Sequence, residues 1–250
     1  MNQFVDAIQF IFNEHESPAG GAQVGGLSNM WDLMSEHLQL SVAAMAIACA
    51  LSIPLGLWLG HIGKGGFLAI NASNVGRAVP SLALIAFFFA YIGVGFTNLA
   101  LALVLLAIPP ILTNTYTGVR QVDRETVDSA RGMGMTGAQI VRRVELPLAL
   151  PLIFGGIRIS AVNVIATATL GPLAGVVTLG DPIINVNTYG DEGRLAAAIV
   201  VALLAVATEL VLGAVQRAVT PRGLKLEGGG GHRWRRLAFA MPNDRREAST

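Results

Sequence analysis

The chain has 250 residues, of which 53% are hydrophobic and 13% are charged. Soluble domains carry about 25% charged residues, and residues 78–119 of this chain contain no Asp, Glu, Lys or Arg at all. Such a run is long enough for more than one bilayer crossing at about 20 residues per helix. The composition therefore excludes an ordinary soluble domain and predicts an all-α membrane protein.

The charges that are present divide unevenly along the chain. Several acidic residues precede the first basic residue, Lys64, whereas basic residues cluster at 120–143 and at 217–246. Because cytoplasmic loops carry an excess of Lys and Arg, we expect the N-terminus outside and the C-terminus in the cytoplasm. The single Cys49 provides no disulfide framework, and the early sequence lacks the basic segment of a cleavable signal peptide.

We expect three regions in chain order. Residues 1–37 form an extracytoplasmic N-terminal arm, which either lies on the membrane interface or is poorly ordered. Residues 38–217 form a transmembrane domain, and residues 218–250 form a cytoplasmic tail that is largely disordered. The transmembrane domain contains five predicted spans, at 38–59, 67–91, 99–117, 148–169 and 195–215.

Several features qualify these spans. Pro80 interrupts the second one, because proline removes a backbone donor and clashes with the preceding turn. Residues 171–193 form an external segment that begins apolar, and whether it is partly re-entrant stays open. An odd number of spans places the two termini on opposite sides of the membrane, in agreement with the charges.

The interval at 123–147 is polar and densely charged, although apolar spans flank it on both sides. Ser129 and Ala130 are small and leave a shallow face for another protein. Gly134 permits a sharp bend between two short helices, and Pro147 suits the first turn of the following span. We therefore predict a helix–turn–helix that is rigidly joined to the fourth span and offers a docking surface in the cytoplasm.

The same interval resembles the EAA loop, E-A-A-x3-G-x9-I-x-L-P, of permease subunits from ABC importers. It departs from that pattern conservatively at Asp128, Ser129 and Val144. The resemblance implies that this loop couples the permease to a cytoplasmic ATP-binding subunit. The coupling residues it implies are Asp128, Ser129, Ala130, Gly132, Met133, Gly134, Met135, Val144, Leu146 and Pro147.

Flanking segments are similar to one subgroup of these permeases, the osmoprotectant transporters. They read VPSLAL, PPILTNTYTGV, AVNVIATATL and AVTPRGLKL. The resemblance implies a type I importer (MetI-like) permease fold of about five transmembrane helices with a cytoplasmic coupling-helix loop. It also implies ATP-driven uptake of glycine betaine, choline, carnitine or a related solute. The segment at 171–175 departs from many relatives, which bears most on the choice of solute.

The resemblance also implies partners for the chain. They are cytoplasmic ATPase subunits, a second permease subunit (a copy or a paralogue) and a separate extracytoplasmic solute-binding protein. The chain itself would bind no cofactor, because ATP and Mg would belong to the ATPase. Two alternatives stay open: a permease for amino acids or another small solute, and an ATP-independent channel or secondary transporter.

Other motifs carry no chemistry. Gly132, Gly134 and Gly137 match the spacing of a dinucleotide fingerprint, but no strand precedes them, so the match is accidental. The four histidines are scattered without metal-ligand spacing, and no nucleophile–base pair is visible. We expect no enzymatic activity, no metal site and no nucleic-acid partner in this chain.

Ionisable residues inside spans are costly and usually functional, and here they are Arg77, Arg158 and Glu209. We predict that Arg158 pairs with Glu209 and holds the fourth span to the fifth, a structural role that we favour over a role in transport. Weakly polar residues also recur along one stripe of the fourth span, where a translocation path and helix packing are equally good explanations. These path candidates are Gly156, Ser160, Asn163 and Thr167, with Asn114 on the third span.

Overall fold

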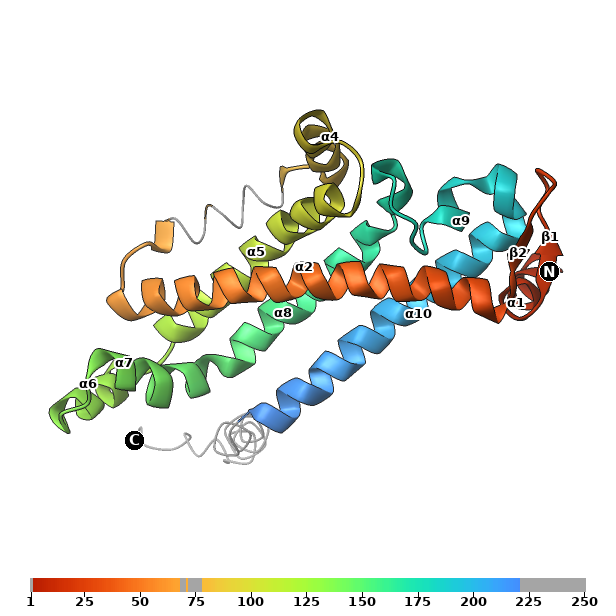
Figure 1. Ribbon diagram of the computed structural model, residues 1–250. Helices are drawn as coiled ribbons and strands as arrows, with labels where there is room; N and C mark the ends of the chain where they lie inside the picture. The colour runs from red at the N-terminus through yellow and green to blue at the C-terminus, as the bar shows by residue number, and fades with distance from the viewer. Residues whose placement is uncertain (1, 68–70, 72–77, 221–250) are drawn as a thin grey trace, which may run out of the picture.

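Long helices running side by side dominate the computed structural model, which describes residues 2–67, 71 and 78–220 (Figure 1). The helices long and apolar enough to cross a membrane are α2 (Gly26–Ile62), α5 (Phe96–Arg120), the continuous run Gly137–Ala168, and α10 (Val186–Val219). The predicted all-α membrane fold is confirmed.

The second predicted span lies partly outside the described residues, which omit 68–70 and 72–77. Its described part is α4 (Ser81–Ile92), whose 12 residues are too few to cross a bilayer on their own. Pro80 occupies the N-cap of α4, so the predicted interruption is present. Within the described ranges, four helices meet the length of a span, where the sequence predicts five.

Helix α5 lies at the centre of the bundle and packs against both α2 and α8 (Leu146–Ala168). The contact with α2 is close, because a Cβ added to Gly60 would lie 2.6 Å from the Cβ of Val119. Small residues at such crossings let two helix backbones approach one another. Leu103 and Ile111 of α5 are fully buried there, together with Ala44 of α2.

Residues 2–25 form a folded N-terminal cap, a name we use for α1 (Asn2–Phe12) and the antiparallel pair β1 (Glu14–Glu16) and β2 (Gln23–Gly25). The cap packs on the first turns of α10, where Phe10 and Tyr189 share one buried cluster. The N-terminal arm is therefore folded in the structure and not poorly ordered. Helix α2 starts at Gly26, so it also contains residues 26–37 that the sequence assigned to the arm.

The segment after α8 folds back on the helix that precedes it. It contains the 3₁₀ helix η2 (Gly171–Ala174) and the short helix α9 (Asp181–Ile184). Thr178 Oγ1 donates to the carbonyl of Ala168 at 3.0 Å, which ties the returning chain to the end of α8. Helix α10 then begins before the predicted residue 195, with a kink at Gly190.

Candidate functional site: a coupling unit and a charged groove

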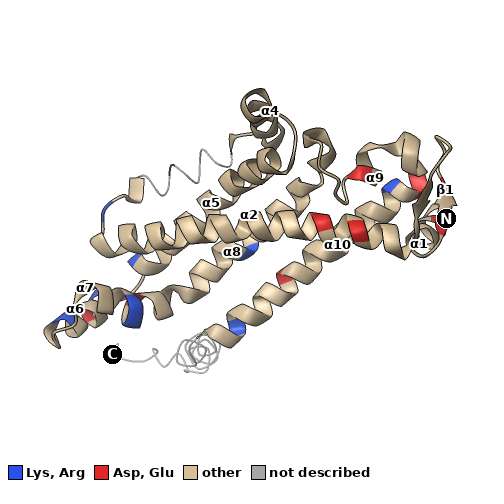
Figure 2. Ribbon diagram, in the orientation of Figure 1, with Lys and Arg blue, Asp and Glu red and all other residues tan. Residues whose placement is uncertain are grey.

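Residues 123–147 form the structure that we call the coupling unit, at the opposite end of the molecule from the N-terminal cap (Figure 1). It consists of α6 (Arg124–Gly132), α7 (Gly137–Ile140) and the π-helix η1 (Val141–Glu145), which continues directly into α8. Figure 2 shows charged residues gathered there and near the N-terminal cap, with few on the helices between. The predicted pair of short helices joined to the fourth span is present.

Side-chain caps define where the two short helices begin. Asp123 accepts a hydrogen bond from the backbone N–H of Glu125 at 3.2 Å, which caps α6. At α7, the hydroxyl of Thr136 accepts from the N–H of Gln139, and the Gln139 side chain accepts in return from the N–H of Thr136. This reciprocal capping box satisfies two backbone donors at once, so the sequence itself sets the start of α7.

The bend between the two helices is at Gly134, which has a φ of 84°. The N–H of Gly134 donates to the carbonyl of Arg131, and the N–H of Met135 donates to the carbonyl of Ala130. This pair of bonds is a Schellman motif, which requires a left-handed residue at the position of Gly134. The predicted role of this glycine in the turn is confirmed.

The predicted coupling residues divide between an exposed face and a buried base. Met133 is 76% exposed, although its side chain is apolar, while Ala130 is 3% exposed. Ala130 therefore packs inside the chain, which corrects the expectation that it offers a face to a partner. Exposed members are Asp128, Ser129, Gly132, Met133 and Gly134, and partly buried members are Met135, Val144, Leu146 and Pro147.

A contact that the sequence did not suggest ties the coupling unit to α2. The Nδ1 atom of His61 lies 2.8 Å from Oε2 of Glu145, although the two residues are 84 positions apart. The side chain of Glu145 is 6% exposed. In the sequence, His61 is one of four scattered histidines without metal-ligand spacing. The clue available in the sequence was Glu145, a carboxylate at the point where the polar interval meets the apolar fourth span.

The predicted ion pair between Arg158 and Glu209 is present and joins α8 to α10. Gln216 extends it, because Arg158 Nη1 donates to Gln216 Oε1 at 2.8 Å and Gln216 Nε2 donates to the carbonyl of Pro151 at 3.1 Å. The Nε atom of Arg158 is buried without a hydrogen-bond partner among the described residues. Arg77, the third intramembrane charge, lies outside the described residues.

The polar stripe on α8 is divided between two environments. A Cβ on Gly156 would lie 2.8 Å from the Cβ of Asn114, and the hydroxyl of Ser160 donates to the carbonyl of Ala107 at 2.9 Å. Both residues are buried against α5, so the assignment of Gly156 and Ser160 to a path is corrected to helix packing. Asn114 donates to the carbonyl of Pro110 in its own helix.

The remaining two stripe residues are not buried: Asn163 is exposed and Thr167 is partly exposed. A role for them in a path stays a prediction.

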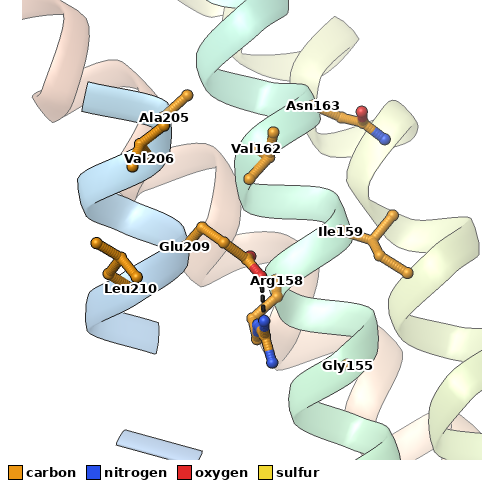
Figure 3. Close-up of a pocket in the computed structure, with 9 residues that line it drawn as sticks. All are labelled: Gly155, Arg158, Ile159, Val162, Asn163, Ala205, Val206, Glu209 and Leu210. Atoms are coloured by element: carbon orange, nitrogen blue, oxygen red, sulfur yellow. Dashed lines mark hydrogen bonds and ion pairs between the residues drawn. The ribbon is translucent and has the colours of Figure 1, made fainter. Parts of the chain in front are cut away.

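The ion pair opens onto a groove of about 700 Å³ between α8 and α10, which we call the charged groove (Figure 3). Figure 3 shows the two charged side chains pointing toward one another from the two helices. The rest of the groove is almost entirely apolar. Its lining residues are Gly155, Arg158, Ile159, Val162, Asn163, Ala205, Val206, Glu209 and Leu210.

A second groove, the apolar groove, has a volume of about 320 Å³ and lies between α2, α8 and α10. It uses Ile157, Ala161 and Ile165 of α8, whereas the charged groove uses the neighbouring positions Arg158 and Val162. The two grooves therefore flank the α8–α10 contact on opposite sides, and the charged lining residues that the structure describes, Arg158 and Glu209, belong to one of them.

Comparison with known proteins identifies the family. The model of the binding-protein-dependent transport system inner membrane components matches residues 52–223. The chain belongs to this family. As an inner membrane component, it is a transport subunit with several apolar helices.

Named relatives cover most of the chain. The glycine betaine/carnitine/choline transport system permease protein OpuCB of Bacillus subtilis is 40% identical over 191 residues, which are 76% of this chain and 88% of that protein. The carnitine transport permease protein OpuCB of Listeria monocytogenes is 40% identical over 197 residues, which are 78% of this chain and 90% of the relative.

Solved structures share the fold. An inward-facing MetNI methionine ABC transporter chain matches with a TM-score of 0.66 at 21% identity, covering 78% of this chain and 98% of that one. An amino acid ABC transporter chain matches with a TM-score of 0.59 at 18% identity, covering 76% and 93%. The predicted fold of ABC importer permeases is thereby confirmed for this transport component.

Proposed function

We propose that this inner membrane component is the permease subunit of an ATP-driven importer for osmoprotectants such as glycine betaine, choline and carnitine. The observation that carries the proposal is the 40% identity to permeases whose names specify these solutes, over about three quarters of the chain. The solutes share a quaternary ammonium group, and glycine betaine and carnitine add a carboxylate.

The coupling unit is the proposed contact with a separate ATPase subunit, which would hold ATP and Mg. Its exposed side chains include the apolar Met133 and the charged Asp128, and a partner would bury the first and pair with the second. Because α7, η1 and α8 form one continuous helix from Gly137 to Ala168, movement of the docked ATPase would tilt a membrane span directly.

The proposed orientation places the coupling unit and the end of α10 in the cytoplasm and the N-terminal cap outside. Arg120 ends α5, and Arg142 and Arg143 lie in η1 of the coupling unit. Basic residues thus gather at this end of the bundle, whereas acidic residues gather near the N-terminal cap (Figure 2). The positive-inside rule favours this arrangement. A solute-binding protein would then approach from the side of the cap.

A second permease subunit, either a copy or a paralogue, would complete the path. Helix α10 supports this proposal, because only 11% of its most apolar window is buried within the chain. Its exposed large side chains include Leu203, Val206 and Leu210. Part of this surface would face the second subunit and part would face lipid.

Reconstitution of the complete transporter tests the proposal. Proteoliposomes with the permease, its ATPase and its solute-binding protein should show ATP-dependent uptake of glycine betaine, choline or carnitine, and these solutes should stimulate ATP hydrolysis. Uptake restricted to amino acids would support the alternative permease. Uptake without ATP would overturn the assignment in favour of a channel or secondary transporter.

A further inference from the structure

The Arg158–Glu209 pair lies halfway along its helix within the membrane. Arg158 is 12 residues after Leu146 and 10 before Ala168, distances of about 18 Å and 15 Å at 1.5 Å per residue. A hydrocarbon core is about 30 Å thick, so the pair sits near its middle. Charges at that depth face the interior of a protein or a water-filled cavity.

The two grooves beside the pair therefore face different surroundings. Among the residues that the structure describes, the lining of the apolar groove has no ionisable side chain other than the thiol of Cys49, so lipid chains or apolar protein can fill it. The charged groove contains the pair, whose side chains are 32% and 39% exposed for Arg158 and Glu209. This groove must open toward water or protein.

We propose that the charged groove is a contact site for zwitterionic solutes inside the membrane. In it, the guanidinium of Arg158 receives the carboxylate of the solute and the carboxylate of Glu209 receives its quaternary ammonium group. This inference rests on the proposed function and extends it to named residues of the permease.

Charge balance favours such an exchange. An unpaired charge buried in a protein is strongly destabilising, and without a solute Arg158 and Glu209 neutralise one another. A zwitterion inserted between them replaces one ion pair by two, so that no charge is left alone. The net charge of the site is zero before and after binding.

The chemistry of each side chain fits its half of the solute. Arginine presents a planar fork of donors that matches a carboxylate. Gln216 holds one of these donors at 2.8 Å, and this bond would keep the guanidinium in place while Glu209 changes its partner.

The remainder of the groove suits methylated ammonium groups. Val162, Ala205 and Val206 line it with apolar atoms, which tolerate N-methyl groups and offer few hydrogen bonds that would trap the solute. Its volume of about 700 Å³ is in the usual range of small-molecule sites, about 300–1,000 Å³.

Two solutes that differ in the carboxylate test the proposal. Uptake of glycine betaine and of choline is measured in proteoliposomes that contain the complete transporter with the wild-type permease or with a variant. Arg158→Gln should lower betaine uptake roughly tenfold more than choline uptake, since choline lacks the group that a charge-assisted hydrogen bond would hold. Glu209→Gln should lower both, because both solutes carry the ammonium group.

The matched control is Leu212→Ala, which trims α10 on the side of the apolar groove and keeps both charges and Gln216. It should change the two uptake rates by one common factor. The ratio of the two rates within one variant does not depend on how much transporter assembles, so a partly folded variant still gives an answer. Arg158→Lys, which keeps the charge and loses the fork, should shift the ratio in the same direction.

If Arg158→Gln and Arg158→Lys leave the ratio of betaine to choline uptake as it is in Leu212→Ala, the pair is a structural link and the proposed site is overturned. Failure of the proposed function would look different. In that case the wild-type transporter itself takes up neither solute.

Discussion

The imidazole of His61 and the carboxylate of Glu145 lie 2.8 Å apart and join the last turn of α2 to the coupling unit. Gly137 of α7 lies against the same imidazole, because a Cβ there would be 3.1 Å from Nε2 of His61. The end of one span therefore contacts two parts of the proposed ATPase docking unit. Any displacement of that unit must carry α2 with it or break this contact.

Replacing Glu145 should uncouple the two elements. Glu145→Ala removes a buried, charge-assisted hydrogen bond, which we expect to cost about 1–3 kcal/mol of stability. We expect a lower melting temperature of the purified permease and weaker solute-stimulated ATP hydrolysis in the complete transporter. Glu125→Ala, on the exposed side of α6, is the control and should leave the melting temperature unchanged. Equal melting temperatures for the two variants would argue against a structural role for the contact.

The turn at Gly134 provides a second prediction. A Cβ at this position would meet no atom of the described residues within 4 Å, so a substitution there acts through backbone strain. A left-handed conformation costs a residue with a Cβ about 1–2 kcal/mol, and Gly134→Val should therefore misplace α7 relative to α6. Uptake and solute-stimulated ATP hydrolysis should both fall sharply, while basal hydrolysis by the ATPase remains.

Gly132→Ala is the comparison for this turn, since Gly132 has open space around it among the described residues and no positive φ. Any effect of that substitution would come from the exposed docking face and not from backbone strain. Gly134→Asn should retain more activity than Gly134→Val, because asparagine visits the left-handed region more readily. If the valine variant transports as well as the wild type, the geometry of this turn is not needed for coupling.

Two adjacent glycines on α8 test whether this face of the helix packs against α5 or lines a translocation path. A Cβ on Gly156 would come within 2.8 Å of the carbonyl oxygen of Pro110, whereas a Cβ on Gly155 would meet nothing within 4 Å. Gly156→Ala should overpack the α5–α8 contact and cost about 1–3 kcal/mol. Gly155→Ala should be neutral or stabilise the helix by up to about 1 kcal/mol. Thermal unfolding of the two purified variants checks the contrast, and equal melting temperatures would contradict the close contact.

Thiol labelling can establish the orientation. On a Cys49→Ser background, Ala19→Cys in the N-terminal cap should react with a membrane-impermeant maleimide added to intact cells. Gln121→Cys, exposed at the C-cap of α5 just before the coupling unit, should react only after the membrane is opened. The reverse pattern would invert the proposed topology and remove the cytoplasmic docking surface.

The local chemistry of the coupling unit made it predictable. Gly134 demands a left-handed turn, and the capping pair of Thr136 and Gln139 is three residues apart, so both features are written into short stretches of sequence. The pairing of Arg158 with Glu209 was also predictable, since each charge in an apolar span needs an opposite partner nearby. These predictions depend on local rules or on the cost of an unpaired charge.

Other features depend on tertiary packing. Helix α2 begins at Gly26 because the cap and the first turns of α10 cover residues such as Leu33. The polar sequence around Leu33 gives no sign of this contact. The periodicity of Gly156 and Ser160 identified a face of α8, but it gave no information on whether that face meets water or another helix. The contact of His61 with Glu145 joins segments 84 residues apart, and no local pattern predicts it.

The continuous helix from Gly137 to Ala168 carries both the proposed ATPase contact and Arg158. One end of this helix lies in the coupling unit, where the ATPase is proposed to dock, and Arg158 lies about two thirds of the way along it. When this helix tilts relative to α10, the distance between Arg158 and Glu209 must change at the same time. The ATPase would then control when a solute can enter between the two charges, and no separate gate would be needed.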